Sequence, residues 1–377
     1  MAQNDAAQHD DALTLFLELT ALPSPPGEER AVADVVLRYL RDLGLEPDED
    51  DAGAQIGSTM GNVYVRLEPT AEGKPLFFCA HLDTVPPSGP LQPVVEDGVV
   101  RNAGGTILGA DNKASVVAML EGVRRVLAEG RPHAGIELIF TPKEEVGLHG
   151  IAAFDHDRLH ADLGYVYDQA APIGEIILGA PHAQSMDVTF HGRAAHSGMF
   201  PEEGRSAIQA AAKAIADLRL GRVDEETTTN VGTISGGTAG NIVPEWCSFL
   251  AEARCQDERR LHEMVQEMLD AFSFAATSCD CEVETEARKS YRGYRFKRED
   301  DVVALAAAAL ARCGHEATYA LSGGAADANV FNERGRRCVN LANGMTDIHT
   351  PDERIAVEDL SAMVEVTLAL IEEALAR

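Results

Sequence analysis

Apolar and polar residues along this chain follow two patterns, which predict buried strands and amphipathic helices. A continuous apolar run at Leu76–Ala80 and a strand-like run at Gly135–Thr141 predict strands of a covered sheet. Apolar residues three or four positions apart predict helices at Leu13–Leu22 and Glu28–Leu43. Because strands and helices alternate from about residue 11 to residue 179, we expect an α/β sheet covered by helices.

A different pattern begins after Pro181. Its order, strand, helix, two strands, helix and strand, is the βαββαβ order of a ferredoxin-like domain. The predicted elements are Ser185–His191, Ser206–Leu218, Thr229–Ser235, Cys247–Arg254, Glu258–Ala276 and Glu282–Ala287.

Strand–helix alternation resumes near Ser290 and closes with a helix at Val357–Leu375. The 377 residues exceed the usual size of one domain, so two domains are expected. We predict one domain of residues 1–179 and 291–377, interrupted by a domain of residues 180–290.

The end of the strand at Leu76–Ala80 carries a first candidate site. His81 and Asp83 lie two residues apart, so both side chains can point to the same face. His81 can then bind a metal while Asp83 orients the imidazole or a nearby catalytic group. An ordinary polar pair at a strand end is the competing interpretation.

A second candidate is Asp111, which precedes a run of apolar residues at helical spacing and so lies where a helix begins. An ordinary N-cap carboxylate is one interpretation. A carboxylate at this end is also stabilised by the helix dipole, which suits a ligand shared by two cations. The residues alone leave both interpretations open.

Two adjacent carboxylates, Glu144 and Glu145, follow the strand at Gly135–Thr141. An acidic pair is usually solvated surface, but here one carboxylate can bind a metal while the other takes a proton from water. Asp168 ends a further apolar run, and His349 lies in a loop near the C-terminus.

Taken in chain order, these five segments resemble the dinuclear zinc peptidases and deacylases that include peptidase T, carboxypeptidase G and acetylornithine deacetylase. The resemblance covers nearly the whole chain. Thr141–Leu148 and Leu220–Thr228 are most similar to the peptidase T-like branch. The implied fold is an α/β zinc-peptidase domain with a central mixed sheet covered by helices, interrupted by a ferredoxin-like lid and dimerisation domain.

The resemblance also implies a role for each candidate residue. Glu144 matches the general base, and Asp83 matches an aspartate that orients the site from behind the ligands. A cis peptide is implied between Asp111 and Asn112. Cobalt or manganese could replace zinc on the same nitrogen and oxygen ligands. The implied ligands of two zinc ions are His81 and Asp168 on one ion, Glu145 and His349 on the other, and Asp111 between them.

Three residues of the predicted insert match positions that act on substrate in this family. His196 resembles the lid histidine that polarises the substrate carbonyl, often in the site of a neighbouring subunit. Asn241 and Arg254 match positions that hold a substrate carboxylate, a role that suits the two-pronged guanidinium. Without the resemblance, His196 would be interpreted as a turn histidine and Arg254 as a surface ion pair.

Asp327 and Asn329 are expected to line the cleft, with no role assigned. The Ala325–Ala326 segment before them is one residue longer than the usual Gly-Gly-Ser-Asp spacing of the branch. The geometry of that loop is therefore left open.

Charge and composition limit the classes of partner that the chain is expected to bind. Lys and Arg number 32 and Asp and Glu number 61, a net charge of −29, which argues against nucleic acid or an anionic membrane. No secretory signal or membrane-spanning segment is visible, so we expect a cytoplasmic protein. The seven scattered cysteines indicate reduced thiols.

The candidate residues and the resemblance together predict a zinc metallopeptidase that hydrolyses amide bonds of short peptides. The resemblance implies the tripeptide aminopeptidase type and a homodimer formed through the insert. A carboxypeptidase or an N-acyl-amino-acid deacylase would use the same site. An inactive metal-binding interaction protein is disfavoured, because all five ligand positions and Glu144 carry competent residues. The sequence leaves open which peptide terminus is recognised and which substrate side chains are preferred.

Overall fold

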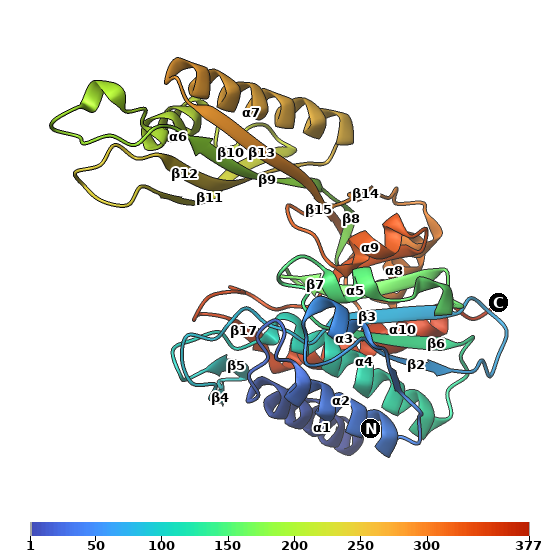
Figure 1. Ribbon diagram of the computed structural model, residues 1–377. Coiled ribbons are helices and arrows are strands. Elements are labelled where there is room, and N and C mark those ends of the chain that lie inside the picture. Colours follow the sequence, from blue (N-terminus) through green and yellow to red (C-terminus); the bar gives the residue numbers. More distant parts are fainter. Residues whose placement is uncertain (1, 377) are drawn as a thin grey trace. The chain divides into compact units, whose positions relative to one another are not determined.

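The computed structural model describes residues 2–376, with side chains from residue 11 onward. The chain divides into two compact units, Met1–Leu178 with Arg295–Arg377, and Gly179–Tyr294 (Figure 1). We name them the first unit and the inserted unit. Each has its own hydrophobic core.

A mixed sheet forms the centre of the first unit. In the described residues its strand order is β1-β2-β6-β3-β7-β16-β8-β14, with β15 paired to β8. The four central strands, β6, β3, β7 and β16, run parallel, and β2 and β8 run antiparallel to their central neighbours. The strands are β1 (Asp48–Glu49), β2 (Val63–Leu67), β3 (Leu76–His81), β6 (Ile136–Thr141), β7 (Leu163–Gln169), β8 (Glu175–Ala180), β14 (Tyr294–Arg295), β15 (Thr318–Leu321) and β16 (Arg337–Ala342).

Helices cover this sheet. Helices α4, α8 and α10 pack with α1 on the main core, whereas α9 contacts β3, β7 and β16 and packs against α5. The rings of Phe77 on β3 and Phe331 on α9 lie 4.5 Å apart between centroids. The helices are α1 (Ala2–Thr20), α2 (Arg30–Asp42), α3 (Ala52–Ile56), α4 (Ala110–Glu129), α5 (His149–Ala153), the 3₁₀ turn at His156–Arg158, α8 (Asp301–Arg312), α9 (Asp327–Glu333) and α10 (Val357–Glu373).

The apolar pattern explains these elements and their limits. All six residues of β3 and of β6 are buried, as expected for parallel strands covered on both faces. Helix α4 lies between Gly109 and Gly130, whose φ angles of 79° and 61° favour glycine. Helix α1 begins earlier than predicted, because its first turns are polar and give no apolar period.

A small sheet lies at the edge of the first unit, with strand order β17-β5-β4. Two of its strands, β4 and β5, form an antiparallel hairpin with its turn at Asp97–Gly98. Its strands are β4 (Pro93–Glu96), β5 (Val99–Asn102) and β17 (Arg354–Ala356).

The inserted unit has the predicted ferredoxin-like order, extended by a short strand. Its antiparallel sheet runs β10-β11-β12-β9-β13, and α6 and α7 pack on it and on each other. On β9, Met186, Val188 and Phe190 face the core while Asp187 and His191 are exposed, the alternation of a half-covered strand. The elements are β9 (His182–His191), the 3₁₀ turn at Pro201–Glu203, α6 (Ala207–Asp217), β10 (Gly221–Arg222), β11 (Thr227–Gly236), β12 (Trp246–Cys255), α7 (Glu258–Ser278) and β13 (Glu282–Tyr291).

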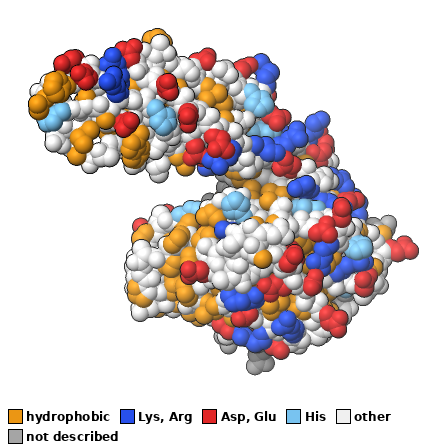
Figure 2. All heavy atoms as spheres, viewed as in Figure 1, with side chains coloured by type: hydrophobic (Ala, Val, Ile, Leu, Met, Phe, Trp, Pro, Cys, Tyr) orange, Lys and Arg blue, Asp and Glu red, His pale blue; other side chains and the backbone are white. Residues whose placement is uncertain are grey.

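Acidic side chains are spread over the visible face of both units, interspersed with basic ones (Figure 2). Among residues 2–376, no helix has the length and apolar character needed to span a bilayer. The predicted fold class, a helix-covered mixed sheet interrupted by a ferredoxin-like insert, is confirmed.

Candidate metal centre

The candidate ligands of the first unit meet at the carboxyl ends of its four parallel strands. His81 is the last residue of β3, and Glu144 and Glu145 follow β6. Asp168 lies near the end of β7, and the His349 loop follows β16. Because these strands are neighbours in the sheet, their ends converge at the edge where open α/β sheets bind ligands.

Asp111 lies at the centre of this cluster. Its Oδ1 atom is 3.2 Å from His81 Nε2, and its Oδ2 atom is 3.2 Å from His349 Nε2. The two oxygens of one buried carboxylate thus face two different imidazoles. The expected cis peptide between Asp111 and Asn112 is present.

Each imidazole has a second carboxylate beside it. His81 Nε2 is 3.7 Å from Asp168 Oδ1, and His349 Nε2 is 3.0 Å from Glu145 Oε1. The structure therefore groups His81 with Asp168 and His349 with Glu145, one group on each oxygen of Asp111. Ligand atoms of His81, Asp111 and Glu145 also all lie within 4.8 Å of one another.

Asp83 organises the site from behind. Its Oδ1 accepts a hydrogen bond from the backbone N–H of Glu144 at 2.9 Å, and its Oδ2 accepts one from Glu145 N–H at 3.1 Å. His81 Nδ1 lies 2.9 Å from the Asp83 carbonyl oxygen. Because a carbonyl oxygen only accepts, the ring carries a proton on Nδ1 and directs Nε2 at the cluster.

Two further residues hold ligands in place and were missed in the sequence. The Asn340 side chain accepts from Asp168 N–H and donates to Asp168 O, both at 2.8 Å, where the pairing of β16 with β7 is irregular. Glu353 accepts three backbone hydrogen bonds from the segment before and at Asp111. Their partners are backbone atoms, which no residue pattern marks.

Burial and neighbouring charges shift the pKa values of the acidic groups in this cluster. Burial, with the charge of Asp111 added, raises the pKa of Asp168 to about 7. Burial also raises the pKa of Glu144 well above its usual value, against the opposing charge of His81. For Asp111, the neighbouring imidazoles of His349 and His81 outweigh the effect of burial and lower the pKa.

The donor set fits divalent metal ions. It offers two imidazoles and carboxylate oxygens without a thiolate, the ligand type of zinc, cobalt and manganese sites. Oδ1 of Asp111 is buried and makes no hydrogen bond of good geometry, which is the condition of an atom that binds a cation.

Asp327 and Asn329 are both buried at the start of α9. Asp327 Oδ2 accepts hydrogen bonds from Thr141 Oγ1 at 2.7 Å and from Cys79 Sγ at 3.4 Å. Asn329 Oδ1 accepts from Ala326 N–H at 3.2 Å. Asp327 is thus attached to β3 and β6 beneath their functional ends.

The residues of the inserted unit that are candidates for binding substrate lie in or beside its sheet. His196 is exposed and pairs with Ile242 in an isolated bridge, and Ser197 N–H donates to Asn241 O at 3.0 Å, so His196 and Asn241 lie close together. His196 Nδ1 accepts hydrogen bonds from two backbone N–H groups, at 3.2 Å each, which places the ring proton on Nε2. Arg254 donates a hydrogen bond to Glu252 at 3.1 Å. This is the ion pair expected for Arg254 when the family resemblance is set aside.

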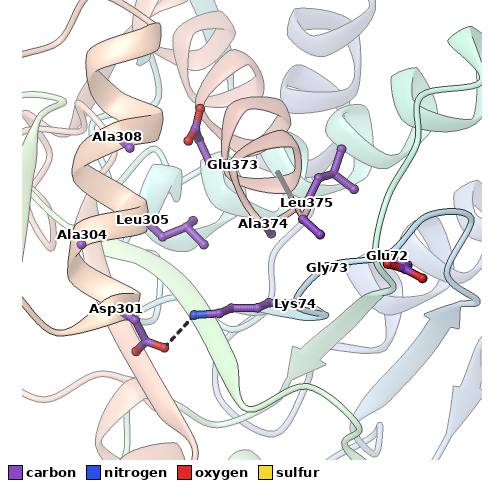
Figure 3. Close-up of a pocket in the computed structure, with 11 residues that line it drawn as sticks. Glu72, Gly73, Lys74, Asp301, Ala304, Leu305, Ala308, Glu373, Ala374 and Leu375 are labelled. Carbon is purple, nitrogen blue, oxygen red and sulfur yellow. Dashed lines mark hydrogen bonds and ion pairs between the residues drawn. The ribbon is translucent and has the colours of Figure 1, made fainter.

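A cavity of about 750 Å³ lies elsewhere on the first unit, between the start of α8 and the end of α10 (Figure 3). Lys74 Nζ and Asp301 Oδ2 form an ion pair across it at 3.0 Å. Its lining contains no His or Cys, so it offers neither imidazole nor thiolate ligands.

Known proteins resemble the chain over nearly its full length, among them one uncharacterized protein and two peptidases of known structure. The uncharacterized Bacillus subtilis protein YqjE is 40% identical over 359 residues, 95% of this chain and 97% of YqjE. The crystal structure of the aminopeptidase PepT from Bacillus cereus matches with a TM-score of 0.88 and 38% identity, covering 97% of this chain and 98% of that one. A tripeptidase structure from Staphylococcus aureus matches with a TM-score of 0.92 and 34% identity, over the same shares.

A family model described as peptidase family M20/M25/M40 matches residues 77–373, which span every ligand of the cluster. The predicted resemblance to peptidase T-like proteins is confirmed by these matches. The chain therefore belongs to peptidase family M20/M25/M40.

Proposed function

We propose that this protein is a dinuclear zinc aminopeptidase that cleaves short peptides, of the tripeptidase type. The family supports a peptidase, and the aminopeptidase and tripeptidase named above support the class of substrate. The number of metal ions and the role of each residue rest on the geometry of the metal centre.

The observation that carries the proposal is the position of Asp111 between two imidazoles. One carboxylate whose oxygens each face a different His–carboxylate pair suits a bridge between two ions. His81 and Asp168 would hold the first ion, His349 and Glu145 the second, and Asp111 both.

Bound divalent ions would supply Lewis acidity, lowering the pKa of water and polarising the scissile carbonyl. Glu144 then acts as the general base, taking a proton from the attacking water and passing it to the leaving amine. Asp83 holds the backbone of Glu144, so the carboxylate is fixed relative to the ligands. Glu144 is only 9% exposed, which keeps bulk water from competing for that proton.

His196 provides a hydrogen-bond donor for the carbonyl oxygen. Because its Nδ1 accepts from Gly198 and Met199 N–H, its Nε2–H is directed away from its own loop. A positioned donor of this kind stabilises the negative charge that develops on the oxygen. Asn241 and Arg254 would hold the peptide carboxylate, one from each chain of a dimer, because within one chain they lie at opposite ends of β12.

We also propose a homodimer formed through the β11 edge of the inserted sheet. Strand β10 pairs with β11 only at Thr228 and Thr229, which leaves the uncharged stretch 230–236 as an edge, with Ile234 54% exposed. The other edge, β13, carries glutamates, an arginine and a lysine, which discourage pairing. Ile234→Lys should shift the protein to monomer in analytical ultracentrifugation, while Ala287→Lys on β13 should not.

A substrate panel tests the proposed activity. Zinc-loaded protein is given free tripeptides, the same peptides with an acetylated N-terminus, and the same peptides with an amidated C-terminus. The proposal predicts release of the N-terminal residue from free peptides and loss of cleavage when the N-terminus is blocked. Release of the C-terminal residue from blocked peptides would show a carboxypeptidase, and release of acetate would show a deacylase.

A further inference from the structure

Glu353 joins two loops that carry ligands. Its Oε2 accepts hydrogen bonds from Leu108 N–H at 2.8 Å and Gly109 N–H at 2.9 Å, and its Oε1 accepts one from Asp111 N–H at 3.0 Å. The side chain is 1% exposed. One buried carboxylate therefore satisfies three backbone donors at the point where α4 begins.

Glu353 belongs to the loop that also carries His349. That loop is closed at its base by Thr346 and Arg354, whose backbone N–H groups donate to each other's carbonyl oxygens at 3.0 and 3.2 Å. Glu353 N–H donates to Thr350 O at 3.2 Å within the loop. The His349 side chain is 45% exposed, so the loop depends on contacts such as these for its position.

We infer that Glu353 is a positioning residue that couples the two halves of the metal centre, by fixing Asp111 and the His349 loop to each other. The inference rests on the proposed dinuclear site and extends it to a residue outside the ligand set.

The physical reason lies in what the three hydrogen bonds restrain. In the segment that donates these bonds, Gly109 is left-handed, and the φ and ψ angles of Asp111, −79° and 104°, are not helical. A regular helix would not hold this segment, so side-chain acceptors must satisfy its N–H groups. Because Asp111 would contact both ions, a small displacement of its backbone affects both positions.

The test compares Glu353→Gln with Asp352→Asn in metal-free protein. Gln is nearly the same size but replaces one acceptor oxygen with an amide donor, which opposes a backbone N–H. Asp352 is exposed and adjacent, so its change to Asn removes the same charge without touching these bonds. Co²⁺ binding is followed by calorimetry and by the visible spectrum, and amide hydrogen exchange of residues 106–113 is followed by mass spectrometry.

For Glu353→Gln we expect Co²⁺ affinity to fall about 10- to 100-fold, as for other residues that orient metal ligands. Exchange of residues 106–113 should become faster, and Asp352→Asn should match the unmodified protein in both measurements. Unchanged Co²⁺ affinity in folded Glu353→Gln would overturn the inference. Faster exchange with unchanged affinity would also overturn it, because it would show a purely structural contact.

The outcome for the proposed site itself is read from the unmodified protein. If that protein binds fewer than two Co²⁺ ions per chain, the proposed dinuclear site fails whatever Glu353 does. Should Glu353→Gln not fold, Glu353→Asp, which shortens the side chain by one methylene and keeps both oxygens, serves the same comparison. It too is expected to weaken Co²⁺ binding, and unchanged affinity would again contradict the inference.

Discussion

The first unit and the inserted unit bury different kinds of side chain. Among the described side chains, every buried charged residue lies in the first unit, and the only buried polar side chains of the insert are Thr227 and Thr229. The core of the insert is otherwise apolar, with Phe190, Phe249 and Phe272 at its centre. Burying charge costs free energy unless it is paired, so its concentration in one unit marks where the chemistry lies.

The difference shows how the two units can be separated by experiment. Substitutions at the buried polar groups of the first unit should act on metal and turnover. Substitutions in the core of the insert should act on its folding, and those on its surface should act on substrate or on assembly.

The largest expected effect is that of Glu144→Gln in the first unit. It should lower turnover by about 10²–10⁴-fold, because a positioned base is lost while its shape is kept. Metal content should be unchanged, since Glu144 is not proposed as a ligand. Glu145→Gln is the matched comparison and should lose metal as well as activity. Near-normal turnover of metal-loaded Glu144→Gln would exclude Glu144 as the base.

The next largest effect should be that of His196→Ala, which tests an exposed residue of the inserted unit. It should lower turnover about 10²–10³-fold, the usual effect of removing one donor to a developing oxyanion, with metal retained. If His196 acts in the neighbouring subunit, mixing His196→Ala and Glu144→Gln chains should recover activity that neither shows alone. Mixed dimers that form yet stay inactive would exclude action across the interface.

Asp83→Asn should have a smaller effect, on metal binding. The change removes one of the two oxygens that hold Glu144 and Glu145 N–H, and we expect metal affinity or activity to fall about 10- to 100-fold. Asp97→Asn, at an exposed turn, removes the same charge and should leave both unaltered. Equal behaviour of the two variants in a zinc titration would contradict the assigned role of Asp83.

The smallest effect on chemistry should come from the core of the insert. Phe272 is fully buried and its ring lies 5.3 Å from that of Phe249, so Phe272→Ala should lower the free energy of unfolding of this unit by about 3–5 kcal/mol. Metal content should not change. Phe274, on the same helix, is 71% exposed, and Phe274→Ala should shift stability by no more than about 0.5 kcal/mol. Loss of metal in Phe272→Ala would show that the units are not independent in this respect.

Sequence patterns were sufficient for the strands and helices that carry the ligands. The apolar runs before His81 and Glu144 are β3 and β6, and the alternation in the insert predicted its four long strands. Short strands such as β14 and β15 were not predicted, because two to four residues give too little pattern to separate strand from loop.

The site was predicted less completely than the fold. Ligands such as His81 carry recognisable chemistry at recognisable positions. Glu353 and Asn340 do not, since their partners are backbone groups that every residue possesses, and Glu353 lies 242 positions from Asp111. Only the folded chain brings these groups together.

The central claim is that Asp111 bridges two metal ions, and metal analysis of purified, zinc-dialysed protein tests it most directly. The account predicts close to two ions per chain, and loss of both in Asp111→Ala, measured by mass spectrometry of the metal with circular dichroism as the control for folding. A single tightly bound ion in the unmodified protein, or a full ion retained by folded Asp111→Ala, would contradict it.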